Sequence, residues 1–204
     1  MAQKIIGVTG AIGTGKTAAA RMLKSFGGKS VLVLDADKIA RKFLKKGSES
    51  SRAVAQFFPE AMGKKGDIDP KKLANVVFEN KGKLSMLNSL VHPFVIRAIR
   101  QRLDKFSEHV IVLDVPLLVE ADMLDIVDFL VIVDADKKAV VKRSKFSRKD
   151  IERRSAHQLP FEEKKNIAQK KLGNGKVFVI NNSYSRQKTR EQISAVWKAI
   201  EKLK

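Results

Sequence analysis

One segment limits the possible folds of this 204-residue chain more than any other, a glycine-rich loop between an apolar run and a helical pattern. Residues 10–17 read Gly-Ala-Ile-Gly-Thr-Gly-Lys-Thr and fit the pattern G-x-x-x-x-G-K-[ST]. The apolar residues 5–8 precede the loop, and the helix-forming residues 18–23 follow it. Strand, loop and helix therefore occur in the order that a phosphate-binding loop requires. The alternative is a glycine-rich turn that fits the pattern by chance.

Each residue type in the loop suits the binding of a nucleoside triphosphate. The glycines allow the backbone to turn its N–H groups inward, and the start of the next helix adds a partial positive charge. Lys16 would place its ammonium on the β- and γ-phosphates, and the Thr17 hydroxyl would bind Mg²⁺. The residues expected to bind ATP are Gly10, Ala11, Ile12, Gly13, Thr14, Gly15, Lys16 and Thr17.

Short apolar runs rich in β-branched residues predict five buried strands, at 4–8, 30–34, 109–114, 128–134 and 176–181. Helical patterns lie between them, which favours an α/β fold with a five-stranded parallel sheet flanked by helices. The interval 35–108 holds only helical patterns, at 48–58, after an expected N-cap at Asp69, and at 82–106. A final helix over 185–203 is expected to bury Ile193, Val196, Trp197 and Ile200.

The charge balance predicts anionic partners. The chain has 41 Lys and Arg against 22 Asp and Glu, for a net charge of +19, and 20 of the basic residues but only 6 of the acidic ones follow residue 136. Nucleic acid, phosphorylated metabolites and an anionic membrane surface would all fit such a charge.

The absence of cysteine excludes a disulfide scaffold, a thiolate zinc site and a cysteine nucleophile. No apolar run is long enough to span a bilayer, and the N-terminal residues run directly into a strand. We therefore expect a cytoplasmic protein without a membrane partner.

Acidic residues follow two of the expected strands. Asp35 and Asp37 come directly after 30–34, at the end of a strand where ligands bind in open parallel sheets. Asp114 ends the run 109–114 and suits a carboxylate of a magnesium site. The alternatives are that Asp35 caps the next helix and that Asp114 begins a turn.

Taken in order, the motifs of this chain resemble those of the dephospho-coenzyme A kinase family. They are the loop at 10–17, Asp-Ala-Asp at 35–37, Leu-Asn-Ser-Leu-Val-His-Pro at 87–93, Asp-Val-Pro-Leu-Leu-Val-Glu at 114–120, Lys-Arg at 142–143, Gln-Leu-Pro at 158–160 and Val-Ile-Asn-Asn at 179–182. The resemblance covers nearly the whole chain. It implies transfer of the γ-phosphate of ATP to the ribose 3′-hydroxyl of dephospho-CoA, with Mg²⁺.

The resemblance also implies a division of the chain. Residues 1–47, 108–141 and 173–204 would form a P-loop nucleotide-binding core. Residues 48–107 would form a helical CoA domain that is inserted into this core. Residues 142–172 would form a lid.

Roles for individual residues follow from the same resemblance. Asp37 would be the base, and Arg143 and Lys16 would stabilise the transferred phosphate. Asn181 would bind the nucleotide. The residues expected on the substrate side are Asp35, Asp37, His92, Pro116 and Leu117, and those expected on the metal are Thr17 and Asp114. For His92 the alternative is that Pro93 moves it out of helical geometry and marks a bend.

Some features depart from the family or leave other functions open. The family commonly has arginine where this chain has Pro70, and Arg148, Arg153 and Arg154 are further basic candidates in the lid. A P-loop kinase of another small molecule and a nucleic-acid-stimulated ATPase are the alternative functions. Only 13 aromatic residues are available for base stacking, so nucleic acid is the weaker expectation. The expected partners are ATP and dephospho-CoA, with a monomer or small homo-oligomer as the assembly.

Overall fold

The structure is a computed structural model that describes residues 3–64, 66–78, 80–106, 109–144 and 147–203. It divides into two compact units, one of Met1–Leu34 with Phe106–Lys204 and one of Asp35–Lys105. Residues 107–108, at an expected domain boundary, and residues 145–146 of the expected lid lie outside the described residues. No helix among the described residues is long and apolar enough to cross a membrane.

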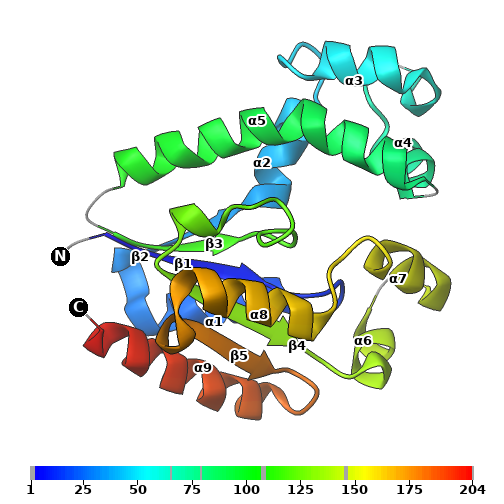
Figure 1. Ribbon diagram of the computed structural model, residues 1–204. Helices are drawn as coiled ribbons and strands as arrows, with labels where there is room; N and C mark the ends of the chain where they lie inside the picture. The colour runs from blue at the N-terminus through cyan, green and yellow to red at the C-terminus, as the bar shows by residue number, and fades with distance from the viewer. Residues whose placement is uncertain (1–2, 65, 79, 107–108, 145–146, 204) are drawn as a thin grey trace. The chain divides into compact units, whose positions relative to one another are not determined.

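A five-stranded parallel sheet forms the centre of the first unit (Figure 1). Its strands are β1 (Lys4–Thr9), β2 (Val31–Asp35), β3 (Val110–Asp114), β4 (Phe129–Asp134) and β5 (Val177–Asn181). They lie in the order β2-β3-β1-β4-β5, so β1 is the central strand. β1 pairs in parallel with β3 on one side and with β4 on the other.

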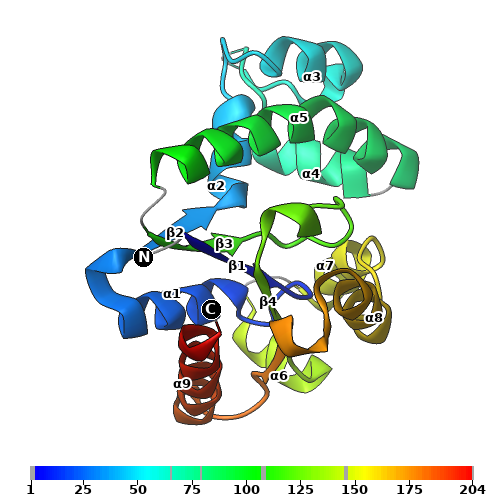
Figure 2. The ribbon, with the colours of Figure 1, turned by 60° about the vertical axis from the view of Figure 1, so that its left-hand side comes forward.

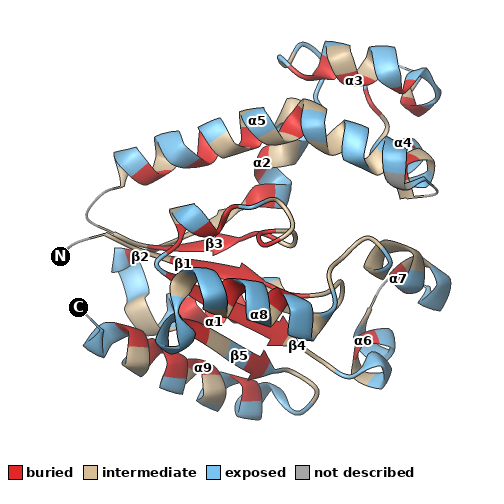
Figure 3. Ribbon diagram, in the orientation of Figure 1, coloured by how far each residue is buried: buried red, intermediate tan, exposed pale blue. Residues whose placement is uncertain are grey.

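Both faces of the sheet are buried around its central strands. All four residues from Leu130 to Val133 in β4 are at most 1% exposed, which explains why the sequence shows a continuous apolar run there instead of alternation. Figure 3 shows the same burial along β1, β3 and β4. The glycine-rich loop thus leaves the sheet at the end of its central strand.

The first unit also contains helices. They are α1 (Lys16–Gly27), α6 (Lys137–Arg143), α7 (Arg148–Ser155), α8 (Phe161–Leu172) and α9 (Arg186–Lys202). α1 and α9 pack against each other, and α8 packs on β4 and β5 (Figures 1 and 2). Short 3-10 turns precede β2, β4 and β5, at η1 (Gly28–Ser30), η3 (Leu124–Ile126) and η4 (Asn174–Lys176).

The second unit is helical. It consists of α2 (Ala36–Phe43), α3 (Ser51–Phe57), the 3-10 turn η2 (Pro59–Ala61), α4 (Pro70–Phe78) and the long α5 (Lys81–Lys105). α5 packs against α2, α3 and α4. The rings of Phe43 in α2 and Phe94 in α5 lie 5.7 Å apart, which joins these two helices in one small core.

The sequence located most elements to within a few residues. Each expected strand begins or ends within one residue of an observed one, and Asp69 caps α4 as expected, because its carboxylate accepts hydrogen bonds from the N–H groups of Lys71 and Lys72 at 2.8 and 3.1 Å. The alternative for His92, that Pro93 moves it out of helical geometry, is wrong, because α5 continues through His92 and Pro93. Val91 and Val95 on either side are each 6% exposed, and their packing holds the helix together across the proline.

The final helix buries the four residues that its spacing predicts, with Ile193, Val196, Trp197 and Ile200 each at most 8% exposed. The Trp197 ring closes the end of α1, since a Cβ atom at Gly27 would lie only 2.6 Å from Cη2 of Trp197. The close packing of α9 on α1 at this point therefore needs a residue without a side chain at position 27.

We predict that Trp197→Ala lowers the free energy of unfolding by about 3–5 kcal/mol, since it leaves a cavity between α1 and α9. Urea unfolding followed by far-ultraviolet circular dichroism measures this change. Lys198→Ala is the matched control, because Lys198 is exposed on the same helix, and it should change stability by less than about 0.5 kcal/mol. Equal stabilities of the two variants would contradict this account of the core.

Candidate nucleotide-binding site

The loop after β1 has the backbone of a phosphate cradle. Gly10 and Gly15 have φ angles of 149° and 96°, which residues with side chains rarely adopt. A Cβ atom at Gly10 would overlap the carbonyl oxygen of Val133 in β4, and one at Gly15 would overlap the side-chain amide of Asn182. The two glycines therefore let the loop lie directly against the ends of β4 and β5.

Lys16 is held inside the loop. Its ammonium nitrogen donates to the carbonyl oxygen of Ala11 over 2.9 Å, and the hydroxyl of the buried Thr14 donates to the same oxygen over 2.9 Å. Lys16 is also the first residue of α1, where the helix N-terminus favours negative charge. A positive side chain and a positive helix end thus meet at one point of the loop.

Thr17 and Asp114 form the expected pair of oxygen groups. The Thr17 hydroxyl donates to Oδ2 of Asp114 over 2.7 Å, and Asp114 ends β3 beside β1 with only 5% of its surface exposed. Hydroxyl, carboxylate and water oxygens are the ligands that Mg²⁺ prefers. The donor set therefore fits a magnesium ion, which Thr17 and Asp114 would hold.

Arg143, the last residue of α6, contacts the loop through its guanidinium. The three nitrogen atoms donate to the carbonyl oxygens of Gly13, Asn182 and Thr14 over 3.1, 2.7 and 3.1 Å. Partial burial lowers the pKa of Arg143 below its usual value, which still leaves the group protonated at neutral pH. The arginine thus places a permanent positive charge against the second half of the loop.

The segment after β5 contacts the loop through Asn182. The Asn182 side-chain nitrogen donates to the carbonyl oxygen of Thr14 over 2.7 Å, and its side-chain oxygen accepts from the Thr189 hydroxyl over 2.7 Å. Asn181, the residue selected from the sequence, uses its side-chain oxygen to accept from the N–H of Ser183 over 2.9 Å. Asn181 therefore shapes the segment, and its neighbour makes the contact with the loop.

Sequence reasoning gave no role to Gln158, although the structure places it on the loop. Its side-chain oxygen accepts a hydrogen bond from the N–H of Ile12 over 3.1 Å. The next N–H, of Leu159, donates to a carboxylate oxygen of Glu120 over 3.1 Å. Gln158 belongs to the motif at 158–160 and Glu120 to the motif at 114–120. The resemblance was the only sequence signal that pointed to these two residues.

Pro116 and Leu117 lie in the turn after β3, in the same unit as the loop. The Pro116 carbonyl oxygen accepts from the hydroxyl of Thr9, the last residue of β1, over 3.0 Å. The turn that follows Asp114 is thus attached to the strand that leads into the loop.

Asp35, Asp37 and His92 belong to the second unit. Asp35 is the N-cap of α2, and its carboxylate accepts from the N–H of Lys38 over 2.9 Å. Asp37 lies in the first turn of α2 and is exposed. Burial lowers the pKa of His92, so its imidazole is neutral over a wider pH range than an exposed one.

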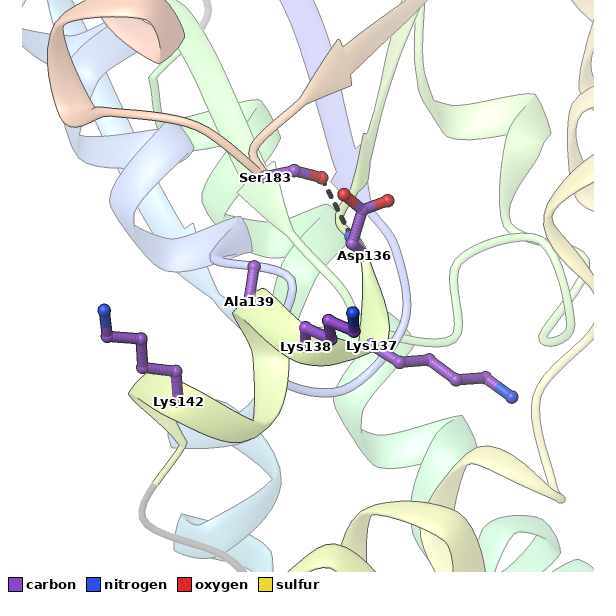
Figure 4. Close-up of a pocket in the computed structure, with 6 residues that line it drawn as sticks. All are labelled: Asp136, Lys137, Lys138, Ala139, Lys142 and Ser183. Carbon is purple, nitrogen blue, oxygen red and sulfur yellow. Dashed lines mark hydrogen bonds between the residues drawn. The ribbon is translucent and has the colours of Figure 1, made fainter.

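A shallow cavity of about 590 Å³ lies between the start of α6 and the segment after β5 (Figure 4). Lys137, Lys138 and Lys142 line it, and Ser183 accepts a hydrogen bond from the N–H of Asp136 over 2.8 Å at its edge. Figure 4 shows Lys137 and Lys142 extending in opposite directions. The lysines therefore do not converge on one ligand position, in contrast to the groups on the loop.

Comparison with known proteins agrees with this arrangement. The family model for dephospho-CoA kinase matches residues 4–178. A dephospho-CoA kinase of Carboxydothermus hydrogenoformans is 37% identical over 205 residues, which cover 95% of this chain and 94% of the relative. One of Fusobacterium nucleatum is 37% identical over 168 residues, which cover 80% of this chain and 86% of the relative.

Solved structures show the same similarity. A crystal structure of a Thermus thermophilus protein superposes with a TM-score of 0.78 at 27% identity, and 100% of both chains is covered. A dephospho-CoA kinase from Campylobacter jejuni superposes with a TM-score of 0.63 at 25% identity, with 98% of both chains covered. The match of the family model and the extent of the relatives lead to one conclusion: the chain belongs to the dephospho-CoA kinase family.

Proposed function

We propose that this protein transfers the γ-phosphate of ATP to the ribose 3′-hydroxyl of dephospho-CoA. The observation that carries the proposal is the joint arrangement of Lys16 on the Ala11 carbonyl and of Thr17 on Asp114, within a loop that the family model covers. Phosphoryl transfer requires positioning of the triphosphate and stabilisation of its charge more than covalent chemistry from the protein. A preformed loop with these groups provides both.

Three cationic contributions are proposed to stabilise the transferred phosphate. Lys16 provides an ammonium at the start of α1, and Arg143 provides a guanidinium that is bound to Gly13 and Thr14. A magnesium ion held by Thr17 and Asp114 would neutralise charge on the β- and γ-phosphates. Lys16, Arg143 and Thr17 already make hydrogen bonds to the loop or to Asp114, so little reorganisation of these side chains would be needed when the triphosphate binds.

Asp37 is the proposed base. An alcohol is a weak nucleophile, and a carboxylate that accepts its proton also orients it for in-line attack. Asp35 caps α2 with one carboxylate oxygen, and its other oxygen lies 3.5 Å from the ammonium of Lys38. These local contacts give Asp35 a structural role, and the resemblance favours Asp37 for the proton.

Residues 142–172 remain our proposed lid, which would exclude water from the transferred phosphate. The two described helices of this region differ in their attachment. α8 packs on β4 and β5, with Ala168 fully buried. In α7 only Ile151 is buried, so we propose that closure is concentrated in α7.

Incubation with Mg-ATP and a panel of acceptors tests the proposed reaction. We expect formation of ADP and CoA with dephospho-CoA, and ADP formation at the ATP-only level with adenosine, AMP or shikimate. The product is identified by mass spectrometry. An equal or greater rate with one of the other acceptors would replace the proposed substrate, and no rate above background with any acceptor would contradict a small-molecule kinase.

Asp37→Asn should bind ATP as the parent does and lose turnover by about 10²-fold or more, because it removes the proton acceptor. Asp35→Asn is the matched control. Asparagine caps helices as well as aspartate does, so this variant should retain turnover within a few-fold. Steady-state rates and ATP titrations measure both effects. Similar turnover in Asp37→Asn and the parent would remove Asp37 from the proposed role.

Hydrogen exchange tests the proposed lid. With a non-hydrolysable ATP analogue and dephospho-CoA, the amides of α7 should exchange several-fold more slowly, whereas those of α8 should be slow with or without ligands. Mass spectrometry after peptic digestion resolves the two helices. Unchanged exchange in both helices would contradict closure of this region.

A further inference from the structure

The peptide group between Ala11 and Ile12 is held from both of its ends. Its carbonyl oxygen accepts hydrogen bonds from the ammonium of Lys16 and the hydroxyl of Thr14, each over 2.9 Å. Its N–H donates to the side-chain oxygen of Gln158 over 3.1 Å. One peptide group therefore connects the loop lysine to Gln158, which lies 146 positions after Ile12 in the chain.

The geometry of a trans peptide makes these contacts interdependent. The C=O and N–H bonds of a trans peptide point in opposite directions, and the described residues include no cis peptide. Gln158 and Lys16 thus bind opposite edges of the same peptide group. Rotation of the plane away from Gln158 would also turn the carbonyl oxygen away from Lys16, so the hydrogen bond to Gln158 opposes such a rotation.

The backbone next to Gln158 is bonded to the first unit through Glu120. Oε1 of Glu120 accepts from the N–H of Leu159 over 3.1 Å and pairs with the ammonium of Lys164 over 3.0 Å. The Lys164 side chain is 3% exposed and that of Glu120 is 14% exposed, so this ion pair is shielded from solvent. The carboxylate of Glu120 thus joins the backbone beside Gln158 to the side chain of Lys164.

Lys164 belongs to α8, which packs on β4 and β5. The segment that carries Gln158 is therefore attached through α8 to the sheet that carries the loop.

We propose that Gln158 is a positioning residue for nucleotide binding, which holds the Ala11–Ile12 peptide so that its carbonyl keeps the ammonium of Lys16 at the phosphate position. The proposal deepens the proposed function and rests on it, because it assumes that the triphosphate of ATP binds on this loop. Gln158 acts through Lys16 and does not itself contact the phosphate. It gives the segment before α8 a role in affinity for ATP.

The test is a double-mutant cycle on the dissociation constant of Mg-ATP. Gln158→Met keeps the length of the side chain and removes its amide, and it should weaken ATP binding about 3- to 10-fold, the effect of one oriented hydrogen bond. In a Lys16→Met background the same change should have almost no effect, because no ammonium remains to be positioned. Gln187→Met, on the exposed face of α9, is the control and should bind ATP as the parent does.

The outcomes separate this inference from the proposed function. A parent protein that does not bind Mg-ATP would contradict the proposed function, and the inference with it. Binding by the parent with an unchanged dissociation constant in Gln158→Met, or with equal weakening in both backgrounds, would overturn the inference alone. A simple structural role for Gln158 predicts equal weakening, whereas positioning of Lys16 does not.

A measurement on the unmodified protein covers the case in which Gln158→Met does not fold. The Ile12 amide should exchange with solvent at least tenfold more slowly than an unstructured amide, because it is bonded to a half-buried side chain. Nuclear magnetic resonance of the ligand-free protein gives this rate. Exchange of Ile12 at the unstructured rate would overturn the inference.

Discussion

The enclosure of β1 between β3 and β4 is the constraint on which the rest of the first unit depends. Ile6 and Val8 are fully buried on one side of β1, and the strand pairs along its whole length. The chain leaves the sheet at Gly10, where contact with the carbonyl oxygen of Val133 excludes a side chain. The first residue of the loop is therefore held against the sheet at the end of the central strand.

The polar groups that hold the loop come from separate segments of the first unit. Asp114 ends β3, Arg143 ends α6, Gln158 precedes α8 and Asn182 follows β5. In a parallel sheet the carboxyl ends of all strands lie at one edge, so the segments that follow them converge. The loop carbonyls of Gly13 and Thr14 that face inward are thus satisfied by side chains, as buried backbone groups require. The fold itself accounts for the position of the site.

Sequence patterns predicted what depends on local periodicity and could not predict what depends on contacts between distant residues. The apolar run of β4 indicates burial, and Asp69 followed by Pro70 indicates the start of α4. Both patterns lie within a few residues of the chain. The contacts of Gln158 with Ile12 and of Asn182 with Thr14 span 146 and 168 residues and leave no local pattern.

At Pro93 a local sequence pattern is present but does not decide the structure. Its local preference is real, but the packing of α5 in the second unit outweighs it. Asp35 lies between these cases, since the sequence allowed both a cap and a ligand, and the structure shows the cap.

The net charge of +19 is weak evidence about binding partners, because several basic side chains make contacts within the fold. Lys164 is buried against Glu120, and Arg143 binds loop carbonyls. The guanidinium of Arg190 lies 4.7 Å from the ring centroid of Phe26, which joins α9 to α1. Lys4 donates to the carbonyl oxygens of Ile200 and Leu203 at the end of α9, where a positive charge complements the helix dipole. A basic side chain that binds a carbonyl oxygen or an aromatic ring adds to the net charge, because it needs no acidic partner in the sequence. A chain that uses basic side chains for such internal contacts is therefore basic even when its ligands are small anions.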